Sequence, residues 1–149
     1  MKLKFAIVTL AVGIPAFFLG PVFWPPELHP VGLQMLGFAV LSGIESLLFG
    51  FGIAFLAFGY PLLCRTSGRK HLLPVFLSVS WLLVSWWPHD SIHAHNGMNL
   101  NGLLAIDYGF HLTLILAALI LAHHVYGIIR HGAGSKDDDV KKGGYEVWT

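Results

Sequence analysis

The residues with the clearest potential for chemistry lie in a short histidine-rich segment that follows a tryptophan pair. His89, His93 and His95 occur within seven residues, together with Asp90. Imidazole and carboxylate groups without a nearby thiolate are ligands that suit zinc, copper or non-haem iron. An extended segment would turn His93 and His95 to one side, whereas a helix would bring His89 and His93 onto one face. Because these geometries exclude each other, we expect only part of the segment to bind a single ion.

A second set of ionisable residues lies inside long apolar stretches. Asp107 and His111 are four residues apart and would share one face of a helix. Glu45 lies in a different stretch, at what we expect to be a comparable depth. Ionisable side chains are costly when they face lipid, so we expect these three to point inward and toward one another. We predict Glu45 or Asp107 as a general base, and as metal ligands His89, His93, His95, Asp107 and His111.

Four apolar stretches must position these residues, at about 5–23, 32–63, 72–87 and 101–129. Each approaches or exceeds the roughly 20 residues that cross the hydrocarbon core of a bilayer. Only 11% of the residues are charged, against about 25% in soluble domains. We therefore predict an all-α integral membrane protein whose residues 1–131 form a four-transmembrane-helix bundle. Residues 132–149, rich in glycine, lysine and aspartate, are predicted to be a flexible cytoplasmic tail.

The distribution of lysine and arginine predicts the topology. The connections 24–31 and 88–100 contain neither residue, whereas the N-terminus, the connection 64–71 and the segment after the fourth stretch contain all nine. The positive-inside rule then puts both termini in the cytoplasm. This N-in/C-in arrangement places the histidine-rich segment on the extracytoplasmic side, and we expect the plasma (inner) membrane. The first stretch could instead be a signal peptide, but Pro15 interrupts it and no A-x-A-like cleavage site follows, so we expect a retained helix.

Two other features exclude classes of function. The net charge of +1, with no clustered basic patch, argues against nucleic acid as a partner. The single cysteine, Cys64, excludes an internal disulfide and any CxxC redox or zinc motif. We do not expect haem, because the first three apolar stretches contain no histidine that could face a histidine of the fourth.

Three short patterns are similar to parts of known families. Asp107, His111 and His124 share the D-x3-H-x12-H spacing of the copper site in the C subunit of particulate methane and ammonia monooxygenases. This similarity covers one helix and implies chemistry rather than kinship. The segment from His89 to His93 resembles the first histidine box of membrane fatty-acid desaturases, but the HxxHH boxes of those enzymes do not follow. Residues 123–131 loosely resemble the haem helix of succinate dehydrogenase anchor subunits, with different spacing.

Three classes of function remain open, and in each of them the protein lies in the lipid bilayer. The first is a metalloprotein, either an enzyme or a metal-handling protein, with a divalent transition metal (copper, zinc or iron) near the outer leaflet. The second is an accessory subunit that packs against other membrane subunits or a second copy, since small residues such as Gly50, Gly52 and Gly59 let helices approach closely. The third is a proton- or metal-coupled transporter that uses the intramembrane carboxylates, although no inverted repeat is evident.

Overall fold

The computed structural model of the chain describes residues 2–27, 29, 31–66, 72–97 and 99–143. The described residues form four helices: α1 (Lys2–Phe23), α2 (Leu33–Thr66), α3 (Leu72–Asn96) and α4 (Leu100–Gly143). Each of them contains a segment that is long and apolar enough to cross a membrane. Within the described residues the chain is all-α, and the four apolar stretches of the sequence correspond to the four helices.

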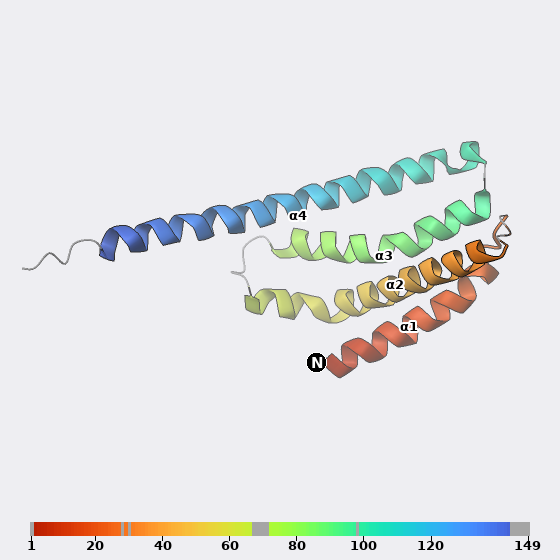
Figure 1. Cartoon of the computed structure of the whole chain (residues 1–149), viewed down its shortest axis with the longest axis horizontal. Coiled ribbons are helices and arrows are strands. Elements are labelled where there is room, and N and C mark those ends of the chain that lie inside the picture. The colour runs from red at the N-terminus through yellow and green to blue at the C-terminus, as the bar shows by residue number, and fades with distance from the viewer. Residues whose placement is uncertain (1, 28, 30, 67–71, 98, 144–149) are drawn as a thin grey trace, which may run out of the picture.

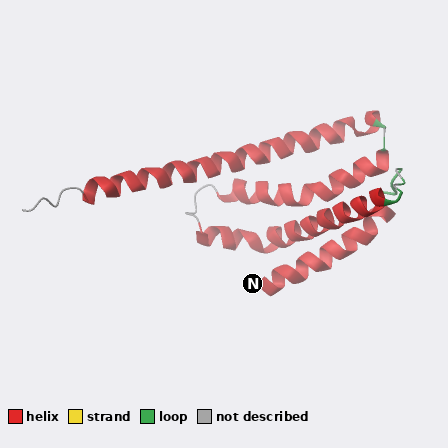
Figure 2. Ribbon diagram, in the orientation of Figure 1, coloured by secondary structure: helices red, strands yellow, loops and turns green. Residues whose placement is uncertain are grey.

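The helices pack in sequential order, and neighbours run antiparallel (Figure 1). α1 packs on α2, α2 on α3 and α3 on α4, with no comparable packing of α1 against α4 in the described part of the chain. The described helices therefore pack sequentially and form an open row (Figure 2). Within the described residues α4 packs extensively against α3 alone, so most of its apolar side chains remain exposed on the surface of the chain.

Glycine allows α1 and α2 to approach each other very closely. A Cβ atom at Gly50 would meet the carbonyl oxygen of Thr9 and would lie 2.7 Å from the backbone nitrogen of Gly13. A Cβ atom at Gly13 would in turn lie 2.9 Å from the carbonyl oxygen of Ser46. Both contacts involve backbone atoms, which cannot move aside easily. The two helices therefore require glycine at this crossing, as in small-residue interfaces between membrane helices.

Aromatic side chains join the first three helices near the connection between α1 and α2. The Trp87 ring of α3 lies 5.2 Å from the Trp24 ring and 4.8 Å from the Phe49 ring of α2, measured between ring centroids. A Cβ atom at Gly20 of α1 would come within 3.5 Å of the same indole. Trp86, the neighbour of Trp87, is exposed. This end of the molecule thus carries Trp24, Trp86 and Trp87, and tryptophan is enriched at membrane–water interfaces.

Two helices end later than the sequence suggests. We expected a loop from Pro88 to Leu100, but α3 continues through Pro88 to Asn96. The histidine-rich segment stays helical because its polar side chains have partners, including the Asn96 amide, which donates to the Ile92 carbonyl at 3.1 Å. α4 continues beyond the fourth apolar stretch to Gly143. The division at residue 131 into a membrane domain and a flexible cytoplasmic tail stays a prediction.

Candidate metal centre

A tight turn between α3 and α4 sets the position of the candidate site. Gly97 has a φ of +53°, and its N–H donates to the His93 carbonyl at 3.0 Å, which ends α3 in the way that glycine commonly ends helices. The Asn99 side chain then accepts a hydrogen bond from the Gly102 N–H at 3.3 Å and caps the start of α4. The chain therefore reverses within residues 97–99. As a result, the last two turns of α3 lie beside the first two turns of α4.

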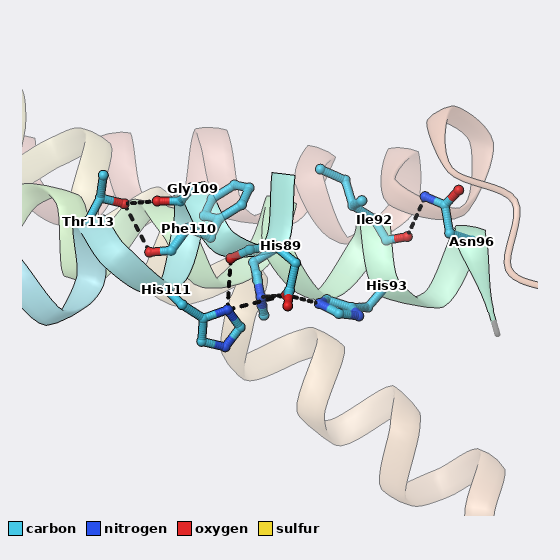
Figure 3. Close-up of polar contacts among 9 residues, drawn as sticks. His89, Ile92, His93, Asn96, Gly109, Phe110, His111 and Thr113 are labelled. Carbon is cyan, nitrogen blue, oxygen red and sulfur yellow. Dashed lines mark hydrogen bonds and ion pairs between the residues drawn. The ribbon is translucent and has the colours of Figure 1, made fainter. Parts of the chain in front are cut away.

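On α3, the helical alternative of the histidine-rich segment is the one that forms. His89 and His93 lie one turn apart on the same face of the helix, and their ring centroids are 4.5 Å apart. Both rings turn toward α4 (Figure 3). The extended geometry that would pair His93 with His95 does not occur, because α3 is helical through this segment.

On α4, Asp107 lies opposite these two histidines. Its Oδ1 atom is 3.3 Å from His89 Nε2 and 2.8 Å from His93 Nε2. The carboxylate is 29% exposed and the two imidazoles are 19% and 38% exposed, so the cluster lies at the edge of the α3–α4 interface rather than in its centre. Three ionisable side chains from two helices therefore meet at one carboxylate oxygen.

The arrangement fits the requirements of a metal ion. The three potential ligand atoms of His89, His93 and Asp107 all lie within 4.8 Å of one another, and these residues could hold an ion. Zinc ligands lie about 2.0–2.2 Å from the metal, which separates neighbouring ligands by roughly 3.3–3.6 Å in a tetrahedron. The distances from Asp107 to the histidines, 2.8 and 3.3 Å, are close to that separation. Small side-chain movements would thus suffice to bind an ion.

His111 lies beside the cluster, one turn after Asp107 on α4. Its Nδ1 atom is 3.2 Å from Asp107 Oδ1 and 2.8 Å from the carbonyl oxygen of Asp107. The ring is 54% exposed, and its centroid is 5.2 Å from that of His89. The predicted proximity of Asp107 and His111 is therefore present, with the histidine at the open side of the cluster (Figure 3).

Two other predicted site residues lie elsewhere. His95 is on the exposed side of α3, and its Nδ1 atom is 2.9 Å from the carbonyl oxygen of Pro25 in the connection between α1 and α2. Glu45 is buried, with 7% of its surface exposed, and its carboxyl group lies within hydrogen-bonding reach of Asp90. Glu45 of α2 therefore points toward α3, where its partner is Asp90, the residue that follows His89. The proposed roles of Glu45 and Asp107 as general bases stay predictions.

Aromatic residues line the inner side of the cluster, and they were not among the predicted site residues. The Phe110 ring packs edge-on against His89 at 5.2 Å and stacks on Trp81 at 5.8 Å, with 12° between the planes of the latter pair. The Trp81 indole donates a hydrogen bond to the Thr113 hydroxyl at 3.1 Å. The signal that could have revealed these residues is spacing, since Trp81, His89 and His93 recur at intervals of four or eight along α3.

His123 and His124 lie three turns or more beyond His111, because α4 continues without interruption between them. They do not approach the cluster, so the D-x3-H-x12-H spacing brings together only its first two members. In comparisons with known proteins, no family model, no curated protein and no solved structure matched this chain. The assignment of the site therefore depends on the geometry of its own residues.

Proposed function

We propose that this chain is a membrane metalloprotein that binds one divalent transition-metal ion between α3 and α4. The observation that carries the proposal is the convergence of His89 Nε2, His93 Nε2 and Asp107 Oδ1 within 4.8 Å. Ionisable groups on membrane helices are costly without partners. One bound metal ion would be a partner for all three side chains, which explains physically why they lie together.

The ligand set indicates which ions suit the site. Two imidazoles and one carboxylate, without sulfur, are compatible with iron(II), zinc or copper. Three protein ligands also leave one or more coordination positions for an outside ligand, as catalytic metal sites do and closed structural sites do not. A bound ion would supply Lewis-acid or redox chemistry there. We therefore favour a metalloenzyme or metal-handling protein over a purely structural site.

Neighbouring residues have supporting roles in this proposal. His111, whose Nδ1 atom is 3.2 Å from Asp107 Oδ1, would orient the carboxylate or serve as a fourth ligand. Glu45 contacts Asp90, the residue after His89, and two carboxyl groups in such a contact share one proton, so the pair would hold or release a proton near the ion and Glu45 would not be a ligand. His95 belongs to the predicted ligand set, but its contact with Pro25 favours a role in holding the α1–α2 connection against α3.

Metal titration of the purified protein tests the proposal. The wild type should bind about one equivalent of zinc or cobalt(II) per chain, and the His89→Ala/His93→Ala variant should bind none tightly. The His123→Ala/His124→Ala variant is the matched control, because it also removes two histidines from one helix while leaving the cluster intact. Equal metal binding by the two double variants would contradict the proposal.

We also propose that the cluster lies at the extracytoplasmic side of the plasma membrane. The antiparallel order brings the connections around residues 24–32 and 97–99 to one end of the row (Figure 1). These connections contain no lysine or arginine, which supports an outer location. Of the basic residues in the opposite connection, Arg69 and Lys70 lie outside the described residues. Reporter fusions after Thr66 and after Gly97 should report cytoplasmic and extracytoplasmic locations respectively, and the reverse pattern would contradict this topology.

The two alternative functions remain open. α4 exposes a long apolar face that includes Leu112, Leu116 and Leu119, which either lipid or another subunit could cover. This feature is compatible with an accessory subunit but does not distinguish it from a protein that acts alone. The transporter hypothesis depends on Glu45 and Asp107, and Asp107 is already a metal ligand in our proposal. Co-purification of further chains in mild detergent would favour the accessory-subunit hypothesis.

A further inference from the structure

A polar contact joins α3 and α4 about two turns away from the candidate metal centre. The Trp81 indole N–H donates to the Thr113 hydroxyl at 3.1 Å. That hydroxyl also contacts carbonyl oxygens of its own helix, at 2.8 Å for Gly109 and 2.9 Å for Phe110. Since the hydroxyl proton points to its own helix, its lone pairs are available to the indole. Figure 3 shows Thr113 with these two contacts to its own helix, which restrict the orientation of its hydroxyl.

Aromatic packing connects this contact to the metal cluster. The Trp81 ring stacks on Phe110 with 12° between the planes, and Phe110 packs edge-on against the His89 imidazole at 5.2 Å. Outside the cluster around Asp107, the Trp81–Thr113 hydrogen bond is the polar side-chain contact between α3 and α4 in the described part of the chain. Ring contacts such as that of Trp81 with Phe110 also join these helices, but they are less directional than a hydrogen bond.

The alignment of the two helices is important because the cluster depends on it. Asp107 precedes Thr113 by six residues, or about 9 Å along α4, and His89 follows Trp81 by eight residues, or about 12 Å along α3. A slip of α4 by one residue would move Asp107 by about 1.5 Å along the axis and by about 100° around it. The carboxylate would then no longer lie 2.8 Å from His93. A fixed contact elsewhere along the pair prevents such a slip.

We propose that Trp81 and Thr113 are positioning residues for the metal centre, whose hydrogen bond sets the register and rotation of α4 so that Asp107 meets His89 and His93. This inference depends on the proposed function, because it assigns these two residues to the same site. Neither side chain is a ligand. Their effect is transmitted through the α3–α4 alignment and through the Phe110 ring that lies between Trp81 and His89.

The test removes the hydrogen bond from either side, and the change at Thr113 also keeps the shape of the side chain. Thr113→Val replaces the hydroxyl by a methyl group, and Trp81→Phe keeps an aromatic ring but removes the donor. Each variant should weaken cobalt(II) binding by about 10-fold or more, the size expected when a group that orients ligands is lost. The visible spectrum of the bound cobalt should also change. Thr113→Ser keeps a hydroxyl and should therefore keep the wild-type cobalt affinity and spectrum. Trp86→Phe, at an exposed tryptophan, is the matched control.

The double variant gives a stricter criterion. Because Trp81 and Thr113 act through one bond, combining Trp81→Phe with Thr113→Val should weaken binding no further than either change alone. Multiplied losses would indicate two independent structural effects and would overturn the proposal. Wild-type affinity and spectrum in a correctly folded Thr113→Val variant would overturn it as well.

A metal-free measurement separates this inference from the proposed function. In metal-free protein with labelled histidine, the nuclear magnetic resonance signals of the His89 and His93 ring nitrogens should report their contacts with Asp107. Thr113→Val should shift these signals, and Thr113→Ser should not. If the wild type binds no metal but the signals shift, the proposed function fails while the positioning role stands. Unshifted signals in Thr113→Val contradict the positioning role whether or not metal binds.

Discussion

Replacing His93 and His95 separately tests which geometry of the histidine-rich segment binds metal. The two side chains are two residues apart on α3, so they point about 200° away from each other around the helix. His93 Nε2 is 2.8 Å from Asp107, whereas His95 Nδ1 is 2.9 Å from the Pro25 carbonyl. We expect His93→Ala to abolish tight binding and His95→Ala to leave it nearly intact.

The expected size of the difference follows from the number of ligands. Four-ligand zinc sites bind with apparent free energies of about 10–16 kcal/mol, which is roughly 3 kcal/mol for each ligand. Since about 1.4 kcal/mol corresponds to a tenfold change in affinity, His93→Ala should weaken binding about 100-fold. His95 shares no contact with the cluster, so its replacement should change the affinity by less than about threefold.

The assay is a competition titration with a chromophoric zinc chelator on detergent-purified protein. Thermal unfolding of each metal-free variant serves as the control, because it separates loss of a ligand from loss of the fold. A His95→Ala variant that loses as much affinity as His93→Ala would refute the helical geometry. It would instead favour the extended pair of alternate histidines that the sequence also allows.

Two further predictions concern the packing that supports the site. Gly50→Ala should destabilise the protein by about 1–3 kcal/mol, because its Cβ would lie 2.7 Å from the Gly13 backbone nitrogen. Gly37→Ala, where nothing lies within 4 Å, should be neutral or stabilising; equal thermal shifts of the two variants in mild detergent would contradict the close α1–α2 contact. Ser85→Ala should be neutral or slightly stabilising, because its hydroxyl is buried and has no hydrogen-bond partner in the described residues. Ser80→Ala removes a hydroxyl that donates to the Phe76 carbonyl at 2.8 Å and should cost about 0.5–1.5 kcal/mol; a larger loss at Ser85 in the same unfolding assay would mean that its hydroxyl has an important partner.

Much of the fold was predictable because length and hydropathy determine membrane spans almost directly. Each apolar stretch became one helix, and the antiparallel order follows from the short connections. The open row was not predictable, since the side chains of α4 are apolar on nearly every face and do not distinguish a neighbouring helix from lipid. The end of α3 was misjudged because Pro88 and the polar residues after it are typical of a loop. The contacts of this segment include Asp107 of α4, which the local sequence around Pro88 does not reveal.

Part of the candidate site was predictable from the spacing of residues along a helix. Asp107 and His111 were expected to be close because a helix brings residues four apart together. The pairing of Asp107 with His89 and His93 depends on the turn at Gly97 and on the register of α3 against α4. The contact of Glu45 with Asp90 likewise depends on the α2–α3 register. Local spacing contains no information on such registers, so the sequence supplied the residue types but not their partners.

The most direct test of the metal centre is extended X-ray absorption spectroscopy of the purified wild type, carrying the metal with which it is isolated. Our account predicts about one ion per chain, bound by at least two imidazoles and by oxygen donors at about 2.0–2.2 Å, without sulfur. The two imidazoles are those of His89 and His93, and one oxygen is that of Asp107. An ion bound without imidazole, or a protein that retains no metal and does not take up added metal, would contradict the account.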